Sequence, residues 1–188
     1  MATVSDGGVT RVNQRVMRGV LSSSVVAYRL RIAAGLTLFV GSPACSSGPE
    51  VGPREGRQAP RFALQTVLGV PVDVPSSRGV PSVVVFWASW CGPCRREAVE
   101  LGEIVRSYGS RVDVVSVNSG EDSTKARLAA EQWGMTWPVA LDPGGRASEA
   151  YEVSAVPLVI VVDGAGVVRY RGNGLPSDPH RLLDGLSG

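Results

Sequence analysis

The segment Phe86-Trp-Ala-Ser-Trp-Cys91-Gly-Pro-Cys94 carries the strongest structural signal in this chain of 188 residues. It continues the apolar, β-branched run 83–85, and such a run is typical of a strand that is buried on both faces. Pro93 can begin a helix, because the first helical turn needs no N–H group from it, and apolar residues then recur at helical spacing up to Gly109. The segment therefore predicts that a Cys-x-x-Cys pair leaves a buried strand and opens a helix.

This placement gives the two cysteines different chemistry. Cys91 would stand at the helix N-terminus, where unpaired backbone N–H groups and the helix dipole stabilise a thiolate. Because the thiolate is the reacting form, we expect Cys91 to be the nucleophile. Cys94 would lie about one turn further along, close enough to form a disulfide with Cys91 and placed to resolve a mixed disulfide.

The alternative for this pair is half of a zinc site. Such a site needs two further cysteine or histidine ligands, and only Cys45 and His180 remain in the sequence. A single histidine also leaves no partner for a multi-histidine metal site and argues against a Ser–His–Asp apparatus. We therefore expect no metal, and no cofactor other than the redox-active disulfide itself.

Strands and helices alternate through the rest of the chain. Apolar runs and turn residues predict strands at 62–66, 72–74, 83–87, 112–117, 139–141, 158–162 and 167–171. Helical spacing and capping residues predict helices at 93–109, 122–133, 147–151 and 177–186. This order predicts an α/β sandwich with a mixed central β-sheet flanked by helices and a small β-hairpin at its start.

The first 60 residues differ from the rest in composition. An arginine-rich stretch precedes the short apolar run 32–40 and the small residues Gly41-Ser-Pro-Ala44. The run is far shorter than the roughly 20 residues that span a bilayer, and these parts together are those of a secretory signal. We expect a signal peptide at 1–44, long enough to allow a true start at Met17 or later. A flexible Gly/Pro-rich tether at 45–58 and a compact domain at 59–188 would follow.

Cys45 directly follows the small residues and allows three interpretations. Ser42-Pro-Ala-Cys45 resembles the end of a bacterial lipoprotein signal, although its serine and proline are atypical there. The same small residues fit an ordinary cleavage site that would release a soluble secreted or periplasmic protein, and a buried structural cysteine is the third interpretation. Lipidation is favoured, because pairing of the other two cysteines would leave Cys45 as an odd thiol outside the cytoplasm. We expect an extracytoplasmic protein that is lipid-anchored to the cell membrane.

Trp90-Cys-Gly-Pro-Cys94 resembles the thioredoxin active site. The whole of 59–188 is similar to the TlpA/ResA branch of tethered extracytoplasmic thioredoxins, which redoxin and AhpC/TSA-type profiles also match. The matching segments are Cys94-Arg-Arg-Glu97, Trp137-Pro-Val-Ala-Leu-Asp142, Tyr151-Glu-Val153, Val156-Pro157 and Asp163-Gly-Ala-Gly166. The resemblance implies a thioredoxin-like fold and a thiol–disulfide oxidoreductase that works through Cys91 and Cys94.

The resemblance also implies roles for neighbouring residues. Pro157 matches the family's cis-proline, which faces the dithiol and helps to hold the substrate strand. Glu97 matches a glutamate that lies near the dithiol in ResA-like proteins and influences its proton transfers, although a solvated acid in the first turn of a helix is an equally good interpretation. Trp90 matches the tryptophan that flanks the nucleophile.

The chain departs from the family pattern at two positions near the dithiol. Val85 stands where many thioredoxins keep a buried aspartate, which leaves Glu97 as the available acid. Val156 stands where a threonine commonly precedes the cis-proline. The pair Gly92-Pro93, by contrast, resembles the pair found in reducing members.

These observations predict a reductant of protein disulfides outside the cytoplasm, acting as a monomer and recharged by a membrane thiol-transfer protein. Clients would include the haem-attachment cysteines of apocytochrome c. The alternatives are a peroxiredoxin-like peroxidase, whose sequence frame Pro81 and Ser89 do not fit, and a copper-delivery protein, which would use a wider cysteine spacing and a paired histidine. Part of the formal net charge of +2 comes from the N-terminal arginines, so we expect no nucleic-acid partner.

Overall fold

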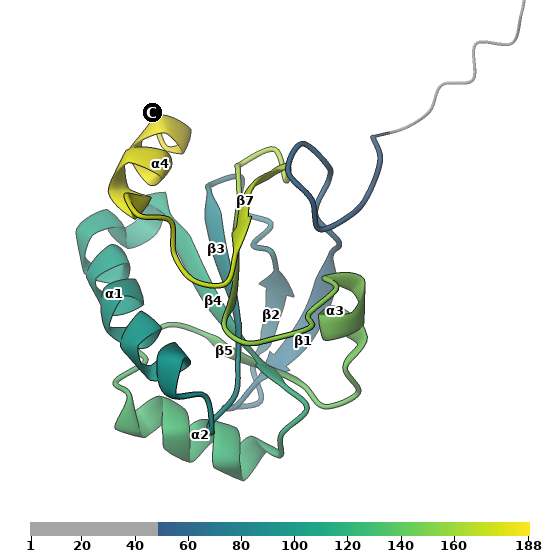
Figure 1. Ribbon diagram of the computed structural model, residues 1–188, viewed down its shortest axis with the longest axis vertical. Helices are drawn as coiled ribbons and strands as arrows, with labels where there is room; N and C mark the ends of the chain where they lie inside the picture. Colours follow the sequence, from purple (N-terminus) through teal and green to yellow (C-terminus); the bar gives the residue numbers. More distant parts are fainter. Residues whose placement is uncertain (1–48) are drawn as a thin grey trace, which may run out of the picture. The chain divides into compact units, whose positions relative to one another are not determined.

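The computed structural model describes residues 49–188 (Figure 1). The expected signal peptide at 1–44, the lipidation site Cys45 and the first part of the tether lie outside the described residues. The strands are β1 Phe62–Thr66, β2 Pro71–Val74, β3 Ser82–Trp87, β4 Asp113–Ser119, β5 Val139–Asp142, β6 Leu158–Val162 and β7 Val168–Gly172. The helices are α1 Gly92–Tyr108, α2 Ser123–Gln132, α3 Arg146–Ala150 and α4 Pro179–Leu186, and a 3-10 turn at Gly109–Arg111 follows α1.

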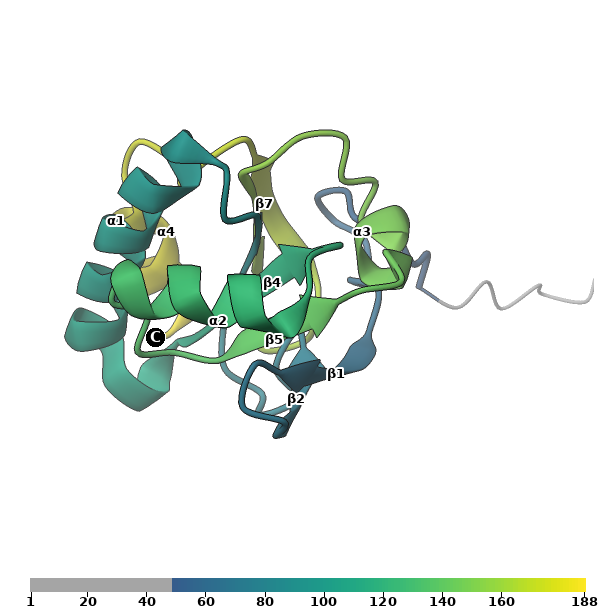
Figure 2. The ribbon, with the colours of Figure 1, turned by 90° about the horizontal axis from the view of Figure 1, so that it is seen from below.

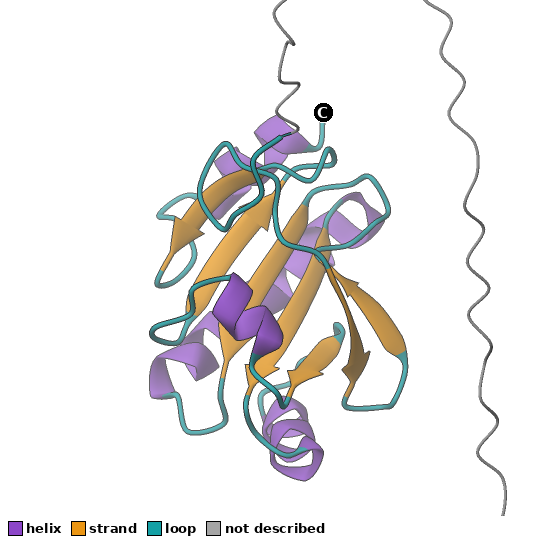
Figure 3. Cartoon of the chain, turned by 90° about the vertical axis from the view of Figure 1, so that its right-hand side faces the viewer, coloured by secondary structure: helices purple, strands orange, loops and turns teal. Residues whose placement is uncertain are grey.

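The strands form one seven-stranded mixed sheet in the order β2-β1-β5-β4-β3-β6-β7. Strands β3, β4 and β5 run parallel, whereas β6, β7 and the β1–β2 hairpin join antiparallel. Figure 3 shows the sheet with α3 in front of it, and Figures 1 and 2 place α1 and α4 on the opposite side. The predicted α/β sandwich with its N-terminal hairpin is confirmed, and every predicted element is present within two residues of its expected bounds.

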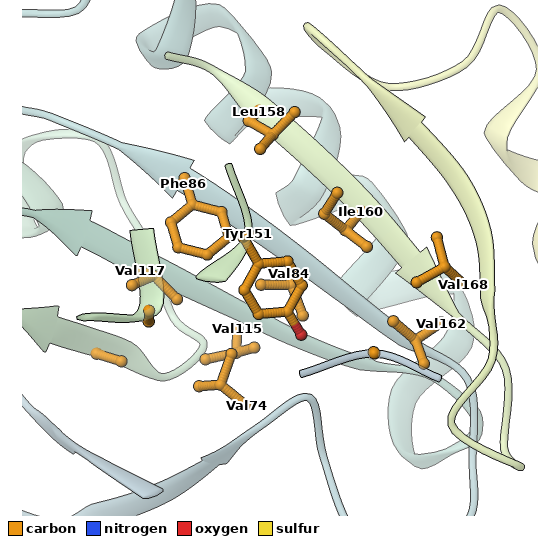
Figure 4. Packing of buried hydrophobic residues seen from close by; sticks show 13 residues of the cluster. Val74, Val84, Phe86, Val115, Val117, Tyr151, Leu158, Ile160, Val162 and Val168 are labelled. Atoms are coloured by element: carbon orange, nitrogen blue, oxygen red, sulfur yellow. The ribbon is translucent and has the colours of Figure 1, made fainter. Parts of the chain in front are cut away.

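β3 is buried along its whole length, so its side chains alternate between two cores. Val84 and Phe86 point into the core that α3 covers, where Tyr151 lies at the centre and its hydroxyl donates to the carbonyl of Pro60 at 2.7 Å (Figure 4). The intervening residues Val83 and Val85 pack against α1 on the other face. Burial on both faces explains why this strand is a continuous apolar run rather than an alternating one.

Residues 50–58 pack onto the β6–β7 hairpin, which differs from the flexible tether expected there. Gly56 donates to the carbonyl of Val168 at 2.9 Å, and Val168 donates to the carbonyl of Arg57 at 2.9 Å. β7 is an edge strand with free backbone groups, and this segment covers them. These two contacts are made by backbone groups, so the side chains of the segment gave no signal of them.

No helix within residues 49–188 combines the length and the apolar content needed to cross a membrane.

Candidate active site

The Cys-x-x-Cys pair lies at the junction of β3 and α1 and forms a disulfide. Cys91 is the N-cap residue of α1, and its Sγ accepts a hydrogen bond from the backbone N–H of Cys94 at 3.2 Å. Pro93 stands in the first turn of the helix, where its missing N–H costs no hydrogen bond. Both cysteines are buried, with 3% and 2% of their surface exposed. The junction thus presents one sulfur to the free N–H groups of the helix end.

An apolar cluster backs the disulfide. Trp87 belongs to this cluster, and the partly buried Trp133 packs against it with a tilted ring whose centroid lies 5.0 Å from that of Trp87. The cluster's other buried members besides the two cysteines are Ala129, Ala130 and Val139. Apolar surroundings disfavour a charged thiolate on Cys94, whereas the helix N-terminus favours one on Cys91. The two sulfurs thus share the apolar cluster and differ in that Cys91 caps the helix.

The loop before β6 faces the disulfide. The carbonyl oxygen of Val156 lies 3.5 Å from Cys91 Sγ, and the Val156–Pro157 peptide bond is cis, as the family resemblance implied. Val156 also packs on the apolar cluster behind the disulfide. The structure thus brings together Cys91, Cys94, Val156 and Pro157 from two segments that lie 65 residues apart in the sequence.

Exposed residues surround the disulfide on its solvent side. Trp90 is 75% exposed, in contrast to Trp87, three residues earlier, which is 1% exposed. Gly92 and Pro93 are exposed as well. The two tryptophans of this short motif therefore differ: Trp87 fills the core, and Trp90 exposes an apolar surface beside Cys91.

Glu97 lies on α1, and its carboxylate contacts the loop between β7 and α4. Its Oε1 accepts a hydrogen bond from the backbone N–H of Leu175. Burial raises the pKa of Glu97, the hydrogen bond from Leu175 opposes this shift, and the nearby charge of Glu100 adds to it. Among residues 49–188, neither cysteine is hydrogen-bonded to this carboxylate, so its influence on the dithiol stays a prediction.

Besides Glu97, the structure shows a glutamate that sequence reasoning missed, Glu121, which contacts the turn just before Cys91. Glu121 follows β4, and its carboxylate accepts the backbone N–H of Ser89 at 2.7 Å and the hydroxyl of Ser89 at 2.6 Å. The side-chain amide of Asn118 donates to it at 2.8 Å. The predicted alternation of strands and helices held a usable signal, because consecutive strands joined by a helix commonly pair in parallel and their carboxyl ends then meet at one edge of the sheet. Residues that follow β3 and β4 were therefore candidates for contact.

No group of three or more His, Cys, Asp or Glu residues that could hold a metal ion occurs in the part of the chain that the structure describes. His180 stacks on Tyr108, the last residue of α1, with ring centroids 5.6 Å apart. Cys91 caps the first turn of the same helix, which is about 25 Å long. The one histidine of the chain therefore lies at the far end of α1 from the disulfide.

Comparisons with known proteins agree with this geometry. The profile of the Redoxin family matches residues 54–184. The thioredoxin-like protein YneN of Bacillus subtilis (strain 168) is 35% identical over 126 residues, which cover 65% of this chain and 74% of that protein. The thiol-disulfide oxidoreductase ResA of the same organism is 30% identical over 115 residues, which cover 61% of this chain and 64% of ResA. Among solved structures, the thiol:disulfide interchange protein DsbE from Chlorobium tepidum superposes with a TM-score of 0.65 at 29% identity, covering 72% of this chain and 99% of that one.

Proposed function

Because the chain belongs to the Redoxin family, we propose that it is a thiol–disulfide oxidoreductase that reduces disulfides in client proteins. One observation carries the proposal: the Cys91–Cys94 disulfide lies at the N-terminus of α1, with the Val156 carbonyl 3.5 Å from the Cys91 sulfur. The similarity to ResA, which is named a thiol-disulfide oxidoreductase, supports it. The reaction needs no cofactor beyond the disulfide.

In the proposed reaction the reduced protein donates two electrons. The Cys91 thiolate attacks one sulfur of a client disulfide, a mixed disulfide forms, and the other client sulfur leaves as a thiolate. The Cys94 thiolate then attacks Cys91 Sγ, which closes the intramolecular disulfide and releases the second client thiolate. The client gains the two electrons that the Cys91–Cys94 pair loses.

The surrounding residues have proposed roles in holding the client. Trp90 offers exposed apolar surface beside Cys91, and the backbone of Val156 and Pro157 faces the sulfur at which the mixed disulfide forms. Gly92 and Pro93, which lie between the two cysteines, are exposed and would leave room for a client chain. Glu97 would hold or release a proton for the dithiol, and the rise in its pKa caused by burial supports this role.

The proposal also includes a place and partners. The composition of residues 1–44 and the position of Cys45 support an extracytoplasmic protein that is lipid-anchored to a membrane. We propose that it acts as a monomer. A membrane thiol-transfer protein would regenerate the dithiol. Clients with exposed disulfides, including the haem-attachment cysteines of apocytochrome c, would consume it.

A redox titration tests both the chemistry and its direction. The whole chain with Cys45→Ser is equilibrated in graded dithiol/disulfide buffers, and the free thiols of Cys91 and Cys94 are counted by mass after alkylation. We expect a midpoint below about −230 mV, nearer to thioredoxin than to protein disulfide isomerase. A midpoint above about −180 mV would reverse the direction to oxidation or isomerisation. Absence of any disulfide would overturn the dithiol mechanism.

A trapping variant tests the mixed disulfide. In Cys94→Ala the second attack cannot occur, so Cys91 should retain client proteins through a bond that a reducing agent releases. The matched control Cys91→Ala keeps one thiol at the same site and should retain none. Equal yields from the two variants would contradict the assignment of Cys91 as the nucleophile.

A further inference from the structure

We propose that Glu121 is a positioning residue for Cys91: its carboxylate fixes the turn Ala88–Cys91 through two hydrogen bonds to Ser89 and so holds the nucleophilic sulfur in place. The inference rests on the proposed function, since it concerns how the same dithiol is held. None of the motifs that predicted the site includes Glu121.

The first step is the state of the carboxylate. Three donor groups converge on its two oxygens: the N–H and the hydroxyl of Ser89 and the side-chain amide of Asn118. An ionised carboxylate can accept from all three donors at once, so the arrangement favours the ionised form. Partial burial works to raise the pKa of Glu121, but these hydrogen bonds outweigh it and the pKa lies below its usual range.

The second step is the turn that the carboxylate holds. The N–H of Cys91 donates to the carbonyl of Ala88 at 3.0 Å, which closes a β-turn with Ser89 and Trp90 at its centre. The N–H of Ser89 has no partner inside such a turn, and Glu121 supplies one. Since Cys91 ends the turn and caps α1, a displacement of Ser89 would move the sulfur relative to the helix end.

The third step is how the chain brings Glu121 to this turn. β3 and β4 run parallel with Trp87 opposite Asn118, so the two strands end at the same edge of the sheet. Gly120 has φ +75°, a left-handed conformation that glycine adopts without strain, and the chain bends there. Asn118 is fully buried: its side-chain N–H donates to the carboxylate at 2.8 Å, and its Oδ1 has no partner within the described residues.

The test measures how fast the reduced protein reacts with a disulfide. Second-order rate constants with oxidised glutathione are measured against pH for the whole chain carrying Cys45→Ser, and urea unfolding of each variant is measured beside them. On the high-pH plateau, where Cys91 is fully ionised, we expect Glu121→Ala to lower the rate constant about 10-fold through misplacement of the sulfur. Glu121→Gln should stay within about twofold of wild type, since its amide can accept from the Ser89 N–H and donate to the Ser89 hydroxyl.

Two further variants make the test specific. Ser89→Ala should lower the plateau rate constant, and adding it to Glu121→Ala should cause no further loss, because both act through one contact. Asp122→Asn is the matched control: it removes the neighbouring carboxylate, which caps α2 and does not touch Ser89, and it should leave the plateau within about twofold of wild type.

The possible outcomes separate the two proposals. A folded Glu121→Ala protein with the wild-type plateau would overturn the positioning role while leaving the proposed function intact. Should Glu121→Ala not fold, an unchanged plateau in Ser89→Ala would overturn it in the same way. A wild-type protein that does not react with the disulfide at all would overturn the proposed function, and this inference with it.

Discussion

Two glutamates hold loops on either side of the disulfide, and their surroundings shift their pKa values in opposite directions. Glu97 on α1 accepts one backbone N–H, from Leu175, while burial and the charge of Glu100 raise its pKa. Glu121 accepts from both donors of Ser89 and from Asn118, and these bonds lower its pKa despite partial burial. Burial and the charge of Glu100 prevail at Glu97, whereas at Glu121 the hydrogen bonds and the charge of Lys125 outweigh burial.

The largest expected effect of this difference is on stability. Glu121→Ala should lower the free energy of unfolding of the oxidised protein by about 2 kcal/mol after allowance for solvent screening, because it leaves the buried Asn118 amide and the Ser89 N–H without an acceptor. Glu97→Ala should lower the free energy of unfolding by about 1 kcal/mol. It leaves a single backbone N–H without an acceptor, and it also removes a charge that burial disfavours. Urea unfolding at neutral pH measures both values, and equal losses would contradict the comparison.

The fold and the dithiol could be predicted from local patterns. The apolar run of β3 followed by Pro93 fixes a buried strand and a helix start, so the cysteines at their junction needed no information from distant residues. Pro157 was placed by family resemblance alone, because an X-Pro bond carries no local mark of its cis form. The contact between Val156 and Cys91 joins positions 65 residues apart, and only the folded chain shows it.

The Glu121 network could not be predicted from its own neighbourhood. Gly120-Glu121-Asp122 has the composition of an ordinary loop with a helix cap, and Asp122 is indeed the N-cap of α2. The contact with Ser89 depends on the register that sets Trp87 beside Asn118 across two parallel strands. Hydrophobic patterns specify the faces of those strands but not which loop residue meets which.

A pH series sharpens the comparison, because the two glutamates should change stability in opposite directions. The pKa of Glu121 is lowered on folding, so the stability of wild type relative to Glu121→Gln should be present above the ordinary pKa of 4.5 and be lost as the pH falls through the folded value. The pKa of Glu97 is raised, so wild type relative to Glu97→Gln should be most stable in acid and lose stability as the pH rises above 4.5.

Urea midpoints of the three proteins, measured from about pH 3 to about pH 8, give both differences. The glutamine variants keep an acceptor for the backbone N–H group, so the differences report charge rather than a lost hydrogen bond. Slopes of the same sign in the two differences would contradict the opposite pKa shifts of the two carboxylates.

The smallest expected effect tests whether the Glu97 charge faces the loop after β7. The Tyr170 hydroxyl donates to the carbonyl of Gly174 at 2.9 Å, in the same loop whose Leu175 N–H is bound by Glu97. Burial raises the pKa of Tyr170, and the charges of Glu97 and Glu55 raise it further. Glu97→Gln should therefore lower the pKa of Tyr170, while burial and Glu55 still hold it above the ordinary value of 10.0.

Carbon-13 NMR of ring-labelled tyrosine measures this shift, with the Tyr170 signal identified by its loss in Tyr170→Phe. Glu121→Gln removes the same charge from the opposite side of the active site and should leave the Tyr170 titration unchanged, since Glu121 is not among the groups that shift it. Glu97 is fully ionised at the pH where a tyrosine titrates, so its charge must act on Tyr170 if the carboxylate lies against this loop. An unchanged titration in Glu97→Gln would mean that the carboxylate points elsewhere, and the difference between the two glutamates would then need another cause.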